Sequence, residues 1–125
     1  MKHFVLLLLF FLFAILGHTQ KTKRFVVPEE RQAFLKENVR IRNGKISALP
    51  GDKFKRIDPN TVALIRNGVV EGNFACSCKS LDKNLGGSCK VSILRGVLIC
   101  SEGSCKGTCE LDIVIQGNKF KLAPK

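Results

Sequence analysis

The residues of this chain that are best placed to do chemistry together are its six cysteines, which all fall within a stretch of 34 residues. An even number of clustered cysteines in a short exported chain is typical of a disulfide framework. We therefore expect the cysteines to crosslink the protein and so supplement a small hydrophobic core. The spacing alone does not select one pairing. The cysteines are Cys76, Cys78, Cys89, Cys100, Cys105 and Cys109.

The strands on which the cysteines are predicted to lie restrict the pairing. Cys76 and Cys78 point to the same face of one strand but are too far apart for an unstrained disulfide, so they should have different partners. Cys89 and Cys100 share a face of a predicted hairpin, one diagonal step apart. A small bulge would allow these two residues to form a disulfide.

Metal binding and thiol redox chemistry are the alternatives for the same thiols. Copper(I) or zinc would be bound by four thiolates, with Cys76, Cys78, Cys105 and Cys109 as the candidate ligands. A thiol-redox protein would use the Cys76-x-Cys78 pair. The chain has no Cys-x-x-Cys motif, which disfavours both alternatives. We therefore assign no metal and no other cofactor.

Other kinds of catalysis have few candidate residues. The two histidines, His3 and His18, both precede residue 21, so the rest of the chain contains no Ser-His-Asp or Cys-His arrangement. Acidic residues are also sparse, and no pair of them is an obvious acid and base. We assign no catalytic residue and no small-molecule substrate, and the sequence favours a protein that is not an enzyme.

The first 20 residues have the pattern of an export signal. Lys2 provides a positive charge, and an unbroken apolar run of 13 residues follows from Phe4 to Leu16. A membrane-spanning helix needs about 20 apolar residues, so this run has the length of a signal peptide instead. We predict cleavage between residues 17 and 20. Residues 21–125 would then form one secreted domain, periplasmic or extracellular, with a basic half (21–66) and a cysteine-rich half (67–125).

Positive charge is concentrated in the half of the chain that has no cysteine. Residues 21–66 contain twelve Lys or Arg and five Asp or Glu, whereas residues 67–125 contain eight and five. Such a field favours an anionic surface or an acidic protein as partner. Nucleic acid is a weaker candidate as partner, because the chain has no Trp or Tyr on which bases could stack. The candidate binding residues are Arg40, Arg42, Lys45, Lys53, Lys55 and Arg56.

The basic half begins with a predicted helix and continues into a hairpin. Pro28, Glu29 and Glu30 suit the first turn of a helix over residues 28–38. Asn43-Gly44 is then a typical two-residue hairpin turn, which would pair Ile41 with Ile46 and Val39 with Ala48 on one face. The other face of this hairpin would carry Arg40, Arg42 and Lys45. Turns at 49–52 and 58–60 enclose a short extended segment.

Three further hairpins are predicted. Asn67-Gly68 would place Ile65 opposite Val70, with Val70 and the alternate residues from Gly72 to Cys78 facing inward. Arg95-Gly96 joins residues 91–94 and 97–100, which are apolar on both faces and should form the most buried pair. Gly117-Asn118 suits a type II′ turn between residues 111–116 and 119–122. The inward residues of this last hairpin are expected to be Ile113, Ile115, Phe120 and Leu122.

These patterns predict a mostly β protein of the small α+β kind, with antiparallel hairpins, one short N-terminal helix and stapling disulfides. The expected function is that of a secreted, basic, non-enzymatic binding module for an anionic surface or protein. One alternative is an extracytoplasmic metal-handling or thiol-redox protein that uses the Cys76-x-Cys78 region. The other is a structural or toxin-like secreted scaffold. The sequence does not indicate an oligomeric state.

Overall fold

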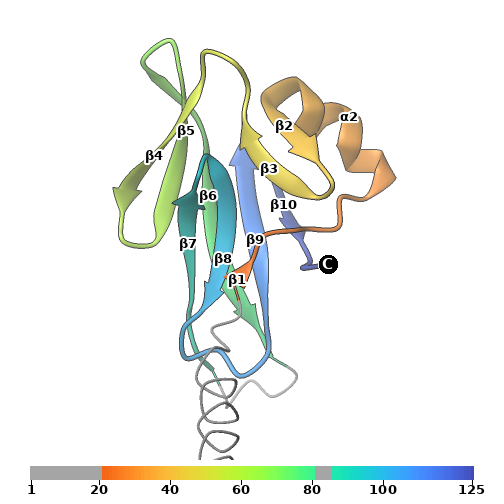
Figure 1. Cartoon of the computed structure of the whole chain (residues 1–125), viewed down its shortest axis with the longest axis vertical. Helices are drawn as coiled ribbons and strands as arrows, with labels where there is room; N and C mark the ends of the chain where they lie inside the picture. The colour runs from red at the N-terminus through yellow and green to blue at the C-terminus, as the bar shows by residue number, and fades with distance from the viewer. Residues whose placement is uncertain (1–20, 81–85) are drawn as a thin grey trace, which may run out of the picture.

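The computed structural model describes residues 21–80 and 86–125. The predicted signal segment 1–20 and most of the loop predicted over residues 81–88 therefore lie outside the described residues. The described chain is mostly β, as predicted, and it forms two antiparallel sheets and one helix (Figure 1). The two sheets share one hydrophobic core with the helix.

The first sheet is built around a central strand, β8 (Val97–Glu102). Strand β7 (Cys89–Leu94) pairs with β8 along its whole length on one side. On the other side, β1 (Lys21–Thr22) pairs near one end of β8 and β3 (Lys45–Ala48) pairs at the other end. Strand β2 (Val39–Arg42) pairs with β3 and forms the outer edge.

The second sheet has the strand order β10-β9-β6-β5-β4. Its longest strand, β6 (Val69–Lys79), pairs with β9 (Thr108–Ile115) and with β5 (Thr61–Arg66). The edges are β4 (Lys53–Asp58) and β10 (Asn118–Leu122). Because every pairing in this sheet except β6 with β9 joins strands that are consecutive in the chain, most of the sheet consists of hairpins.

The helix α2 (Glu29–Asn38) follows Pro28, close to the predicted range. Its side chain Leu35 is fully buried. The Phe34 ring packs edge-to-face on Phe120 of β10, with 6.2 Å between the ring centroids. The guanidinium of Arg31 lies 5.3 Å from the centre of the same Phe120 ring. The helix therefore packs beside the β10 edge of the second sheet. Among the described residues, no helix is long and apolar enough to span a membrane.

Of the five two-residue hairpin turns in the described chain, four have positive φ at both central positions, which is the type I′ conformation, whereas Pro59-Asn60 between β4 and β5 does not. Three of them are the predicted Asn43-Gly44, Asn67-Gly68 and Arg95-Gly96. The fourth is Gln116-Gly117, so the predicted type II′ turn at Gly117-Asn118 is wrong. The register of this hairpin differs from the predicted one by two positions, which keeps the same residues on each face. As expected, Ile113, Ile115 and Leu122 are buried, and Phe120 is partly buried.

A bulge in the β5–β6 hairpin changes which residues face the core. Ile65 pairs with Val70, as predicted, but the next pair is Leu64 with Gly72, which leaves Glu71 without a partner strand residue. An extra residue of this kind reverses the alternation of faces. Val70 is therefore 51% exposed, and its predicted inward position is wrong. The prediction is right from Gly72 onward.

The Arg95-Gly96 hairpin is more fully buried on β8 than on β7, although Cys89 and Val91 of β7 are buried. In β8, Leu98, Ile99 and Cys100 are all buried, because other strands flank β8 on both sides. Strand β7 has β8 as its only sheet partner in the described chain, and its Lys90 and Leu94 are exposed. The prediction of a most buried pair is therefore right for β8 and wrong for β7, which lies at an edge.

Candidate functional site

The six cysteines form three disulfides, and none of them is free. The pairs are Cys76–Cys100, Cys78–Cys105 and Cys89–Cys109, with Cα–Cα distances of 5.7, 5.6 and 5.9 Å. The prediction of a disulfide framework is confirmed, as is the prediction that Cys76 and Cys78 have different partners.

The predicted pairing of Cys89 with Cys100 is wrong. In the hairpin register Val91 lies opposite Cys100, and Cys89 lies one diagonal step away, as expected. Both side chains instead form disulfides with the other sheet, Cys100 with β6 and Cys89 with β9. These two disulfides fasten the sheets together through the core. The third links β6 to Cys105 in the loop between β8 and β9.

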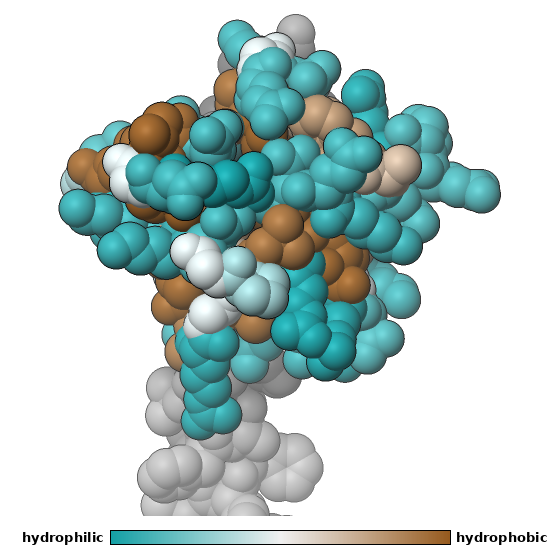
Figure 2. Space-filling view, turned by 90° about the horizontal axis from the view of Figure 1, so that it is seen from above, coloured by the Kyte–Doolittle hydropathy of each residue, from teal (hydrophilic) through white to brown (hydrophobic). Residues whose placement is uncertain are grey.

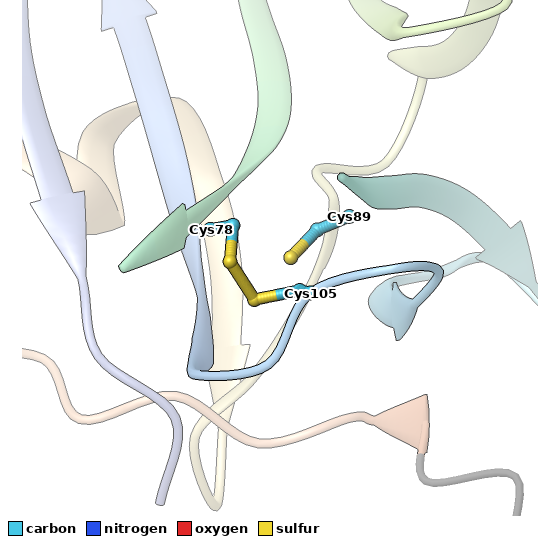
Figure 3. A group of neighbouring side chains, drawn as sticks. All are labelled: Cys78, Cys89 and Cys105. Atoms are coloured by element: carbon cyan, nitrogen blue, oxygen red, sulfur yellow. A yellow bond between two sulfur atoms is a disulfide. The ribbon is translucent and has the colours of Figure 1, made fainter. Parts of the chain in front are cut away.

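Three sulfur atoms from two disulfides lie close together. The Sγ atoms of Cys78, Cys89 and Cys105 are all within 4.8 Å of one another. Figure 3 shows the Cys78–Cys105 bond with the sulfur of Cys89 beside it. Metals are bound by thiolates, and all three sulfurs are held in disulfides. This set also differs from the ligands expected for a metal site, because Cys76 and Cys109 are not part of the group.

The basic face of the β2–β3 hairpin has the predicted geometry. Arg42 lies directly opposite Lys45, and Arg40 lies two residues before Arg42 on the same face. Both arginines are exposed, and Lys45 is partly exposed. Within residues 21–80 and 86–125, the ion pairs are Arg66–Asp52 and Lys121–Asp112. The three basic side chains of the hairpin face therefore have no acidic partner there.

The other three predicted binding residues are separated from this face. Lys53 and Lys55 are exposed on β4, at an edge of the second sheet. Arg56 lies on the same strand, but its guanidinium donates hydrogen bonds to the carbonyl oxygens of Asp58, Pro59 and Val91. Because Val91 belongs to β7, Arg56 connects the two sheets, and these donors are already used.

Arg66 has a role that the sequence analysis did not identify. Its Nε and Nη2 atoms donate to Oδ2 of Asp52 at 3.0 and 2.8 Å, and Nη2 also donates to the carbonyl oxygen of Asn38 at 3.2 Å. The hydrogen bond with Asp52 raises the pKa of Arg66. The sequence gives little sign of this role, because Arg42 and Arg66 occur in the same Ile-Arg-Asn-Gly motif and their local sequence does not distinguish them.

A cavity of about 360 Å³ lies between residues 25–27, helix α2 and the turn of the β2–β3 hairpin. Its lining includes two lysines and no acidic residue. The sequence gives no sign of this cavity, because its walls come from segments that are far apart in the chain. The residues that matter for its chemistry are Val26, Val27, Lys36, Ile41, Asn43 and Lys125.

The surface seen from above in Figure 2 is mainly hydrophilic, with separate hydrophobic patches. The larger exposed apolar side chains in the described chain likewise come from several places: Val26, Ile57, Val69, Val70 and Leu94.

The fold and the disulfides together define a small β-sandwich protein, crosslinked between its sheets. No protein-family model, characterised protein or solved structure matches the chain.

Proposed function

We propose that the protein is a secreted, non-enzymatic module that binds an anionic surface or an acidic protein through the outer face of the β2–β3 hairpin. The observation that carries this proposal is the direct cross-strand pairing of Arg42 with Lys45. Like charges directly opposite each other destabilise a sheet. An anion bound over the pair would remove this repulsion, so binding gains free energy that a scattered set of charges would not give.

Arg40 extends the pair into a row of three positive charges on one face of a rigid hairpin. The turn conformation at Asn43-Gly44 and the burial of Ile46 fix this hairpin against the core. Charged residues on a fixed strand lose less backbone freedom on binding than charged residues on a loop. Lys53 and Lys55 offer a second pair of exposed charges for a large partner.

Export to an oxidising compartment is part of this proposal. Its support is the presence of three disulfides behind a segment with the composition of a signal peptide. Disulfides of this kind persist in secreted, periplasmic and cell-surface proteins and are rare in the cytosol.

Retention on a heparin column across a salt gradient tests the proposal. The variant is the triple charge reversal Arg40→Glu, Arg42→Glu and Lys45→Glu. The matched control reverses three exposed lysines elsewhere, Lys90, Lys106 and Lys119. The two variants have the same net charge.

We expect the hairpin variant to elute at much lower salt than the control. The slope of log affinity against log salt should fall by about 3, since each lost contact lowers it by about 1. Equal losses in the two variants would show that net charge alone controls retention, and the proposal would be wrong.

A further inference from the structure

The cavity beside helix α2 lies on a different side of the hairpin from the basic face. Ile41, which lines the cavity, pairs with the buried Ile46. Neighbouring residues on a strand point to opposite faces, so Arg42 points away from the side on which Ile41 lies. The cavity is therefore a second, separate feature of the basic half of the chain.

Backbone hydrogen bonds hold the walls of this cavity in place. Phe25 N donates to the carbonyl oxygen of Gly44 at 2.8 Å, and Val26 N donates to that of Ala123 at 2.9 Å. The approach of Phe25 to the hairpin turn requires a glycine, because a Cβ at Gly44 would lie 2.7 Å from the Phe25 oxygen. The cavity is thus formed by the fold itself.

The lining combines an apolar part with positive charge. Val26, Val27 and Ile41 provide hydrocarbon surface, and Val26 is 49% exposed. Lys36 and Lys125 are exposed, and both contribute to the lining. A ligand with only apolar groups would cover the lysines without pairing their charges. A ligand with only charged groups would leave the apolar surface in contact with water.

We propose that this cavity binds an amphiphilic anion, with a short hydrocarbon body against Val26 and Ile41 and its anionic head near Lys36. The volume of about 360 Å³ lies within the range of small-molecule sites, roughly 300 to 1,000 Å³. A long polyanion fits the open hairpin face instead. The ligand that fits this lining is a monoanion that carries an alkyl chain.

Titration of the folded protein with octanoate, followed by two-dimensional amide NMR, tests this site. Shifts should concentrate at residues 25–27, 32–36 and 41–44. Acetate, which lacks the chain, and 1-octanol, which lacks the charge, should each bind at least tenfold more weakly. Equal binding of acetate and octanoate would overturn the proposal, as would shifts spread evenly over the lysines of the surface.

Two lysine variants separate the cavity from general charge. Lys36→Gln should weaken octanoate binding by about tenfold, whereas Lys53→Gln, which removes the same charge from β4, should leave it within about twofold. A dispersed amide spectrum of each variant shows that it remains folded. Equal affinity of the two variants for octanoate would contradict the assigned role of Lys36.

This inference does not depend on the proposed function, and the two can fail separately. The Arg40, Arg42 and Lys45 charge reversal should lower heparin retention and keep octanoate shifts in the cavity. Lys36→Gln should weaken octanoate binding and leave heparin retention unchanged. Loss of octanoate binding in the hairpin variant, with Lys36→Gln unaffected, would assign the anion to the hairpin face and overturn the cavity site.

Discussion

Arg66 and Asp52 form an ion pair in which two nitrogen atoms of one guanidinium donate to the same carboxylate oxygen. A further hydrogen bond from Arg66 to the backbone of Asn38 brings the end of helix α2 into the same group. Three segments therefore meet at one arginine: the helix end, the turn before β4 and the end of β5. The side chain of Asp52 is only 9% exposed, so water has little access to the pair.

Replacing Arg66 by Gln should destabilise the protein by about 1 to 2 kcal/mol, because charge-assisted hydrogen bonds are lost and the Asp52 carboxylate loses its cation. The control is Arg42→Gln, in the other copy of the Ile-Arg-Asn-Gly motif. That change removes a repulsive charge and should alter stability by less than about 0.5 kcal/mol, or increase it. Guanidinium chloride unfolding measures both, and equal losses would contradict the assigned role.

The loss in the Arg66 variant should not depend on pH between 6 and 9. Asp52 raises the pKa of Arg66, and a raised pKa gives stability that is complete below the unfolded-state value. This stability is lost only as the pH rises through the folded-state pKa, which lies above the ordinary pKa of arginine. Unfolding curves of the parent protein and the variant at pH 6, 7.5 and 9 should be separated by the same free energy.

Removal of the Cys76–Cys100 disulfide by a double substitution to Ala should cost about 3 kcal/mol from chain entropy alone, because the bridge closes a loop with a sequence separation of 24. Cys100 is fully buried, so a cavity adds to this cost. The Cys78–Cys105 bridge has a similar separation of 27 but ends in a loop. Calorimetry should therefore show a larger drop in Tm for the first variant, and the reverse order would refute the structural argument.

Substitution of Cys109 by Ser should start disulfide exchange. The freed Cys89 thiolate lies within 4.8 Å of both sulfurs of the Cys78–Cys105 bond. Attack on Cys105 Sγ forms a Cys89–Cys105 disulfide and releases Cys78 as a thiolate, with no external oxidant. The rate should rise with pH as the thiol ionises.

Peptide mapping by mass spectrometry after incubation at pH 8.5 detects the new Cys89–Cys105 bond. The matched control is Cys100→Ser, which frees Cys76, a residue outside the sulfur group of Figure 3. Its thiol should stay unpaired under the same conditions. Retention of the original Cys78–Cys105 bond in the Cys109 variant would contradict the prediction.

Gly44→Ala should destabilise the protein more than Gly96→Ala. Both glycines have positive φ, +74° and +80°, so each substitution has a backbone cost of about 1 kcal/mol. Only Gly44 lies against another segment, since a Cβ at Gly96 would meet nothing within 4 Å. The difference between the two variants in thermal unfolding measures the close approach of Phe25. Equal effects would show that Phe25 does not press on this turn.

The local parts of the fold could be predicted because turn chemistry is local. Asn43-Gly44 and Asn67-Gly68 tolerate positive φ, and each fixed the position of a hairpin. The error at Gln116-Gly117 arose because Gly117 can occupy either position of a two-residue turn. The bulge at Glu71 did have a signal, because Gly72 directly follows it inside β6 and an isolated glycine in a strand often accompanies a bulge.

The relationships between sheets could not be predicted in the same way. Alternation along a strand placed Cys76 and Cys78 on the inner face, but it does not say which strand of the other sheet lies above them. The disulfide partners therefore required the structure. The ion pairs could not be predicted for the same reason. Arg42 and Arg66 occur in the same Ile-Arg-Asn-Gly motif, and only the position of Asp52 in the fold shows that Arg66 is the paired one.

The positions of the basic residues also affect self-association. The outer strands of both sheets, β2, β7, β4 and β10, all carry lysine or arginine. Such charges keep the open backbone edge of one molecule from pairing with that of another. An anionic partner that neutralises these strands removes this protection. If the protein binds a polyanion as proposed, dense binding would favour pairing between the sheet edges of neighbouring molecules, and the resulting loss of solubility would limit how much of the surface charge can be neutralised.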